Sequence, residues 1–134
     1  MMRLRSCLVL LLCSLACGGC GKTKSTAQLL EDLKGPEERD RLIAVRLLPQ
    51  RKQEAALIVP ALIEALKDKE NDIRLSAAIG LGSFGEQAAE AIPALQQAAK
   101  GDHDARVCKA AGVALSRIDP AHFSDPSKLP RNPP

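Results

Sequence analysis

Aromatic residues are nearly absent from this chain of 134 residues, which contains two Phe and neither Trp nor Tyr. Its apolar content comes instead from Ala, Leu, Ile and Val, which favours closely packed helices over a sheet rich in β-branched and aromatic residues. The scarcity of aromatic rings also removes the platforms on which the bases of single-stranded nucleic acids stack. The composition therefore predicts an all-α fold.

The chain also lacks the excess of basic residues that binding to nucleic acid requires. Its formal charge is +3, from 19 Lys and Arg against 16 Asp and Glu. Arg3 and Arg5 lie in a segment predicted below to be removed, and the rest of the chain holds 17 basic and 16 acidic residues. Because phosphate backbones select a clearly basic surface, nucleic acid is not an expected partner.

The N-terminus has the layout of a secretory signal peptide. Arg3 and Arg5 precede an apolar run over residues 7–16, and small residues follow that run. A membrane-spanning helix needs roughly 20 apolar residues, and glycines interrupt this run before that length. We therefore predict a cleaved signal peptide at residues 1–16 and a short linker at residues 17–24.

Two cysteines at the end of this signal resemble the lipobox of bacterial lipoproteins. Small residues precede Cys17 in Ser14-Leu15-Ala16-Cys17, and Gly18-Gly19 precede Cys20. The resemblance implies cleavage before the cysteine and attachment of more than one acyl chain, which anchors a protein stably. We predict lipidation of Cys17, with Cys20 and a secretory signal without lipid as alternatives. The implied location is the bacterial cell envelope, where the protein is lipid-anchored on the periplasmic or extracellular face of a membrane.

The middle of the chain contains three copies of one unit. Pro60-Ala61-Leu62 recurs as Pro93-Ala94-Leu95 after 33 residues, and Arg41 recurs as Arg74 with the same offset. Such a period is typical of helical repeats, each of which buries its apolar face only against its neighbours. The units are predicted at residues 25–54, 55–86 and 87–119.

Each unit has two apolar segments joined by a polar turn, which predicts a pair of helices. Ser25 and Gln28 fit a capping box for the first helix of unit one. Asn71 or Asp72, and Asp104, are predicted N-caps of the second helices in units two and three.

The second helix of unit two is apolar on most sides. Its core stripe is predicted at positions with helical spacing, namely Ile73, Ala77, Gly80, Leu81 and Phe84. Leu75 and Ile79 lie off this stripe, and we expect the neighbouring units to cover them as well. Pro60 and Pro93 are expected to bend or break the first helices of their units.

The pattern that follows Pro60-Ala61-Leu62 resembles HEAT-like repeats in their short bacterial form. It reads Asp72-Ile73-Arg74-Leu75-Ser76-Ala77-Ala78-Ile79-Gly80-Leu81-Gly82, and the resemblance covers residues 25–119. It implies an α-solenoid of about three helix pairs. In related repeats, an Asp and an Arg join neighbouring units. Carried over to this chain, the resemblance implies an inter-repeat ladder of Asp72, Arg41, Arg74 and Arg106, in which Asp72 pairs with Arg41 or Arg106.

The sequence predicts no catalytic, cofactor-binding or metal-ligating residue. His103 lies in a turn, and His122 lies in a Pro-rich tail at residues 120–134 that we expect to be disordered. Neither histidine has a ligand partner at the spacing of a metal site. Cys108 is interpreted as a small core residue of the third unit.

These observations predict a protein-interaction scaffold or adaptor that is not an enzyme. The curvature of a solenoid provides an extended surface for an unidentified protein partner. No cofactor and no small-molecule substrate are expected, and the membrane is reached only through the lipid anchor. The resemblance leaves a HEAT-like subunit of a tetrapyrrole-protein lyase as the alternative of another class.

Overall fold

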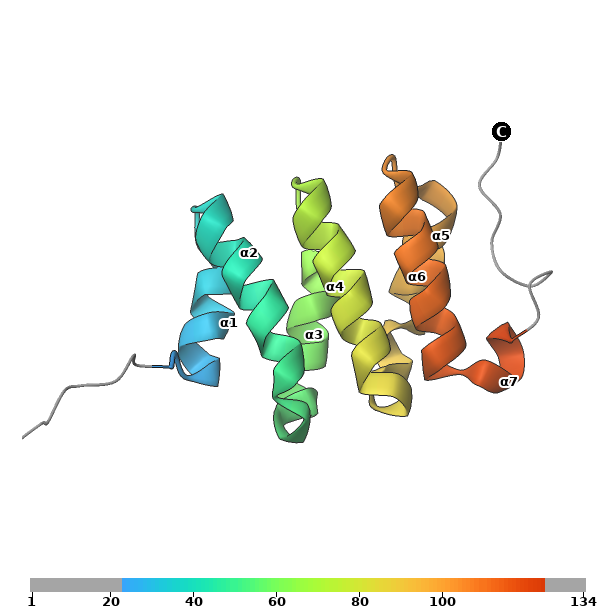
Figure 1. Ribbon diagram of the computed structural model, residues 1–134, viewed down its shortest axis with the longest axis horizontal. Helices are drawn as coiled ribbons and strands as arrows, with labels where there is room; N and C mark the ends of the chain where they lie inside the picture. The colour runs from blue at the N-terminus through green and yellow to red at the C-terminus, as the bar shows by residue number, and fades with distance from the viewer. Residues whose placement is uncertain (1–22, 125–134) are drawn as a thin grey trace, which may run out of the picture.

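The computed structural model describes residues 23–124, and that part of the chain contains helices and no strand (Figure 1). The α-helices are α1 (Thr26–Lys34), α2 (Glu38–Leu47), α3 (Ala55–Ala65), α4 (Asn71–Phe84), α5 (Ile92–Gly101), α6 (Ala105–Ile118) and α7 (Pro120–Phe123). Short 3₁₀ helices connect the units: η1 (Leu48–Gln50), η2 (Lys52–Glu54) and η3 (Gly85–Ala91). The predicted signal peptide, Cys17, Cys20 and most of the predicted tail lie outside the described residues.

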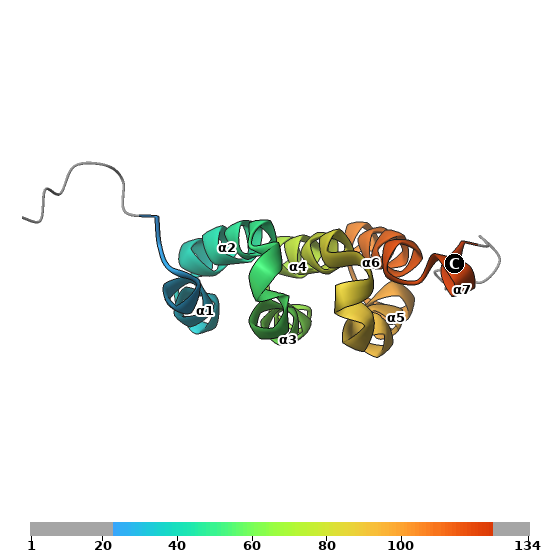
Figure 2. The ribbon, with the colours of Figure 1, turned by 90° about the horizontal axis from the view of Figure 1, so that it is seen from below.

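Six of these helices form two layers (Figure 2). The first helices, α1, α3 and α5, make one layer, and the second helices, α2, α4 and α6, make the other. Consecutive helices pack as pairs, and α4 also packs directly against both α2 and α6. The predicted all-α solenoid of three helix pairs is therefore confirmed.

The core lies between the two layers. It contains apolar side chains from all three units, including Leu29, Val45, Leu62, Leu95 and Leu115, each fully buried. Every member of the stripe predicted on the second helix of unit two is buried as well. This core buries each unit's apolar surface against its neighbours, as expected for a repeat array.

The outer side of α4 is more open than predicted. Ile79 is 53% exposed, and Leu75 is only half-buried. The expectation that neighbouring units cover both residues was wrong, because α2 and α6 lie beside α4 and leave its outward side uncovered.

Small residues allow the second helices to approach closely. A Cβ atom added to Gly82 would lie 2.9 Å from the Cα atom of Ala114 in α6. A Cβ atom added to Gly80 would lie 2.7 Å from the Cγ atom of Pro49. Since interiors are close-packed, side chains at these positions would push the units apart.

The two prolines of the first helices play different roles. Pro60 lies inside α3, which continues through it from Ala55 to Ala65, so the predicted break does not occur there. Pro93 is the second residue of α5, where its missing N–H has no intrahelical partner to lose. The chain before it forms η3, in which Ala88 has non-helical backbone angles.

Capping residues set the ends of several helices. Ser25 and Gln28 form the predicted capping box, with Ser25 Oγ accepting from Gln28 N at 3.2 Å. Asp104 caps α6 as predicted, by accepting from Arg106 N at 2.8 Å. The prediction for α4 was wrong, because its N-cap is Glu70, which makes no side-chain cap hydrogen bond.

The array continues slightly past the predicted end of its third unit. Asp119 caps a short helix, α7, and Phe123 at its end packs against the core. Residues 120–123 are therefore helical, which corrects the predicted start of the disordered tail. Two features explain this helix, because Pro120 occupies its first position and Asp119 accepts a hydrogen bond from His122 N.

Candidate functional site

A bidentate ion pair joins the first and second units. Arg41, the fourth residue of α2, donates from Nε and Nη2 to the two carboxylate oxygens of Asp68, at 2.8 and 3.3 Å. Asp68 belongs to the turn between α3 and α4. Both side chains are mostly buried, with 8% of Arg41 and 12% of Asp68 exposed.

The second and third units are joined in the same way. Arg74, the fourth residue of α4, donates from Nε and Nη2 to Asp102 at 2.7 and 2.8 Å. Asp102 occupies the turn between α5 and α6. Charge-assisted bidentate pairs fix geometry more tightly than single hydrogen bonds. The two pairs therefore act as equivalent steps of one ladder, which we call the Arg–Asp ladder.

Each ladder arginine also holds the turn of its own unit. Arg41 Nη1 donates to the carbonyl oxygens of Gly35 and Pro36, and Arg74 Nη1 donates to those of Asp68 and Lys69. Each guanidinium thus ties its own turn to the turn of the next unit. The buried donors of the ladder are satisfied, as a stable polar network requires.

The electrostatics of the second step follow from this geometry. The hydrogen bonds from the Arg74 guanidinium lower the pKa of Asp102, and burial of the carboxylate opposes the shift. The backbone N–H of Asp104 adds to the lowering by donating to Asp102 at 2.9 Å. The same pair raises the pKa of Arg74. Both groups are therefore held in their charged forms and have no proton to exchange near neutral pH.

The structure places the predicted ladder residues in two different environments. Arg41 and Arg74 belong to the Arg–Asp ladder, whereas Asp72 does not contact Arg41. Asp72 lies 3.2 Å from Arg106 Nη2, and these side chains are 55% and 61% exposed. Arg106 also pairs with Asp104 at 2.8 Å. The predicted Asp72–Arg106 pair is thus a surface contact beside the buried ladder.

The two aspartates of the ladder were missed from the sequence. Asp68 and Asp102 occupy the same position in the polar turns of units two and three, 34 residues apart. This recurrence could have identified both aspartates from the sequence. The prediction missed them because it compared the two turns only by their polar character and not residue by residue.

Cys108 occupies the ladder position of the third unit. It is the fourth residue of α6, and its Sγ donates to the carbonyl oxygen of Asp102, six residues before it, at 3.2 Å. Arg74 donates to the carbonyl oxygen of Asp68 with the same separation. Cys108 therefore replaces the ladder arginine, and Arg106 lies two positions away from it.

A second feature of the described residues is the outward surface of the second helices, which we call the outer face. The second helices contain four large apolar side chains that are more than one third exposed: Ile43 (38%), Leu47 (39%), Ile79 (53%) and Val113 (43%). They come from α2, α4 and α6, so the second helix of each unit exposes some apolar surface.

A groove of about 340 Å³ lies on the outer face between α2 and α4. It is lined by Val45, Arg46, Pro49, Leu75, Ser76, Ile79, Gly80 and Ser83. Gly80 allows Pro49 to pack closely against α4 at the groove, since a Cβ atom at that position would collide with Pro49. Arg46 supplies the only ionised group of the lining.

The charged side chains along the middle and C-terminal parts of the second helices are basic. From their second turn onward, α2, α4 and α6 contain no acidic residue. Arg46, Lys109 and Arg117 are exposed in this acid-free part, while Arg41 and Arg74 are held in the ladder. Acidic residues lie at both ends of this part. Glu38, Glu70 and Asp72 line a separate hollow near the first turns, and Glu86 and Asp119 line another just after α4 and α6.

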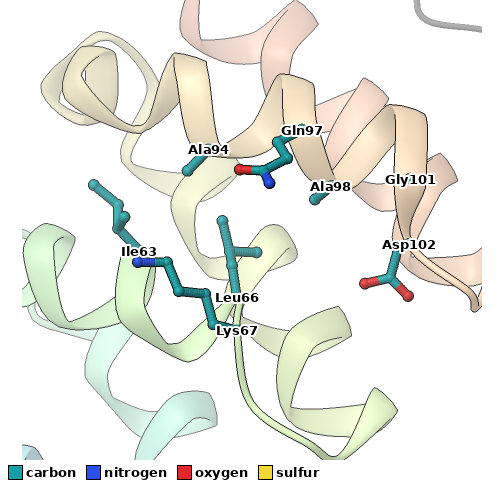
Figure 3. A pocket seen from close by; sticks show the side chains of 8 residues that line it. All are labelled: Ile63, Leu66, Lys67, Ala94, Gln97, Ala98, Gly101 and Asp102. Atoms are coloured by element: carbon teal, nitrogen blue, oxygen red, sulfur yellow. The ribbon is translucent and has the colours of Figure 1, made fainter.

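A second cavity, of about 290 Å³, lies between the first helices α3 and α5 (Figure 3). Its lining is mostly aliphatic, with Lys67, Gln97 and Asp102 as the polar side chains. Asp102 is engaged by Arg74, and Lys67 pairs with Glu64 at 3.1 Å. This cavity therefore brings together no acid, base and nucleophile.

Residues 23–124 contain no cluster of three or more His, Cys, Asp or Glu side chains arranged to hold a metal ion. His122 pairs with Asp119 at 2.7 Å through Nδ1, and His103 lies in the turn before α6. Within the same residues, no helix has the length and apolar character that a membrane span needs.

Comparison with known families agrees with this architecture. Residues 26–116, about two thirds of the chain, match the family described as HEAT repeats. A search of curated proteins found no match. The matched range covers all three helix pairs except the last two residues of α6, and it contains both steps of the Arg–Asp ladder. The chain therefore belongs to the family of HEAT repeats.

Proposed function

We propose that this protein is an exported, lipid-anchored scaffold that binds another protein through the outer face of its second helices. The observation that carries the proposal is that the second helix of every unit leaves large apolar side chains exposed, namely Ile43, Leu47, Ile79 and Val113. Exposed apolar surface that extends over neighbouring elements marks interaction sites in soluble domains.

A non-catalytic role is part of this proposal. The mostly buried ionised side chains Arg41, Asp68, Arg74 and Asp102 are all engaged in the ladder, which joins the turns of successive units. Catalytic sites instead hold titratable groups whose pKa values are shifted toward the working pH. The pKa shifts of Asp102 and Arg74 lead away from neutral pH.

The membrane anchor is the second part of the proposal, and it is supported by the sequence. A signal peptide at residues 1–16 would expose Cys17 for acylation, and α1 begins only a few residues later, at Thr26. Such a linker would hold the repeat array close to the bilayer. The partner would then be a protein of the cell envelope.

The anchor is tested by the intact mass of the protein extracted from membranes. We expect a chain that begins at Cys17 and carries diacylglyceryl and acyl groups, and Cys17→Ser should abolish this mass. Cys20→Ser is the matched control and should leave it unchanged. A chain that lacks lipid would overturn the anchor, and a lipidated chain that begins at Cys20 would reassign it.

The binding face is tested by photo-crosslinking in the intact cell envelope. A photoreactive amino acid at Ser76, which lines the groove of the outer face, should form one discrete adduct with another protein. The same amino acid at Gln97, which is exposed in the layer of first helices, is the control. The absence of an adduct from Ser76, or an equal adduct from both positions, would refute the proposed surface.

A further inference from the structure

We infer that the groove between α2 and α4 binds an acidic amphipathic segment of the partner protein. Apolar side chains of the segment would enter the groove, and its carboxylates would lie against the basic residues around it. The inference rests on the proposed function and adds the chemistry of the partner, which the fold alone does not supply.

The apolar half of this recognition comes from the lining of the groove. Leu75 and Ile79 from α4 and Pro49 from η1 present aliphatic surface to the groove, and Gly80, packed closely against Pro49, belongs to the same lining. A groove between two parallel ridges of side chains is the type of site in which an amphipathic segment buries its apolar face.

The charged half comes from the acid-free part of the second helices. Arg46 lines the groove, Arg117 projects from the last turn of α6, and Lys109 lies on the same side of α6. The aliphatic stem of Arg117 passes close to α4, since its Cδ atom would lie 3.7 Å from a Cβ atom at Gly82. Arg46 is the cation that lines the groove, whereas Arg117 and Lys109 lie on α6, beyond α4. None of the three helices carries an acidic residue beyond its first turn.

Acidic residues on other parts of the molecule would repel an acidic segment, and this limits where the segment can bind. The first turns of the second helices carry Glu38, Glu70 and Asp72, which would repel it. On the opposite layer, α1 and α3 expose Glu31 and Glu64. Glu86 and Asp119 line a further hollow just after α4 and α6. Electrostatic complementarity therefore selects the groove beside Arg46.

The same charges argue against a second copy of the chain on this surface. A two-fold dimer would use the same patch on both subunits. It would therefore place together two surfaces that each carry Arg46, Lys109 and Arg117, without carboxylates of the second helices between them. An anionic lipid surface would share the attraction, but a bilayer does not fill a groove set between two helices.

The inference is tested with synthetic peptides and the protein produced from the full sequence, in detergent. The first peptide has about five helical turns, with Leu at helical spacing and Glu at the other positions. The second carries Lys in place of Glu. We expect the Glu peptide to bind at least about tenfold more tightly by fluorescence anisotropy. Its affinity should fall about tenfold or more between about 50 and about 500 mM salt.

Variants then locate the binding. Arg46→Glu combined with Arg117→Glu should weaken binding of the Glu peptide by about tenfold or more. Lys100→Glu on α5 is the charge control. Ile79→Ser should weaken binding of the Glu peptide by a similar factor. Leu57→Ser, which changes an exposed residue of α3, is the apolar control. Since all five side chains are exposed, each variant should keep the helical circular dichroism of the parent.

The outcomes separate this inference from the proposed function. Equal binding of the Glu and Lys peptides, or loss of binding in the control variants, would overturn the acidic partner. A different result would assign the surface to lipid. In that case the protein binds anionic phosphatidylglycerol vesicles but not the Glu peptide, and the double variant Arg46→Glu with Arg117→Glu no longer binds the vesicles. If Ser76 forms a protein adduct but the protein binds the Glu and Lys peptides equally, the proposed scaffold function stands. Only the inference of an acidic partner segment is then refuted.

Discussion

Loss of the Arg74–Asp102 pair should destabilise the array more than loss of any exposed ion pair. The perturbation is Asp102→Ala, which removes a carboxylate that is 7% exposed and two hydrogen bonds of 2.7 and 2.8 Å. It leaves the Arg74 guanidinium, 12% exposed, without its counterion in the interface between units two and three.

The size of the effect follows from the partners that remain. Removing one partner of a buried ion pair costs about 3–5 kcal/mol, because the other charge stays buried and uncompensated. Arg74 would still donate to the carbonyl oxygens of Asp68 and Lys69 and to Asn71 Oδ1. We therefore expect a loss of about 3 kcal/mol, at the lower end of that range. For a domain of this size, such a loss would lower Tm by about 12–20 °C.

The assay is urea unfolding followed by circular dichroism, with Arg106→Ala as the control. Arg106 pairs with Asp72 at the surface, so its loss should cost less than about 1 kcal/mol. Arg74→Met together with Asp102→Ala should cost less than the sum of the single changes, because no isolated charge remains buried. If Asp102→Ala costs no more than Arg106→Ala, the Arg–Asp ladder does not join the units as argued.

Three further predictions concern packing, pH and capping. Gly82→Ala should cost about 1–3 kcal/mol, because the added Cβ atom would meet the backbone of Ala114. Gly101→Ala, which meets nothing within 4 Å, should instead stabilise the fold by about 0.4–1 kcal/mol, and equal effects in thermal melts would refute this packing. The pKa of Asp102 is lowered in the folded state, so its contribution to stability should be present above about pH 4 and lost below it. Urea titrations between about pH 2 and 6 should therefore give a shallower acid loss for Asp102→Asn, and an unchanged slope would argue against the shift. Ser25→Ala should cost about 1 kcal/mol by loss of the capping box, and no change in urea stability would contradict that role.

Local sequence patterns were sufficient to predict the helices and the apolar core between them. Recurrence of Pro60-Ala61-Leu62 and of Arg41 predicted three helix pairs, and the stripe from Ile73 to Phe84 predicted the buried side of α4. These features depend on the helical period and on propensities within one unit, so they can be predicted without knowledge of how the units stack. The capping box at Ser25 was predictable for the same reason, since both of its hydrogen bonds are local.

The ladder and the outer face were decided by the tertiary structure. Arg41 and Asp68 are 27 residues apart, and they meet only because the second unit stacks on the first. The choice of Asp68 over Asp72 depends on which carboxylate the stacking brings to the guanidinium. The apolar pattern of α4 likewise predicted that Ile79 belongs to an apolar side, but only the arrangement of α2 and α6 determines that this side has no neighbour within the described residues. Periodicity reports which sides of a helix are apolar, whereas the placement of neighbouring helices decides which of those sides remain free to bind a partner.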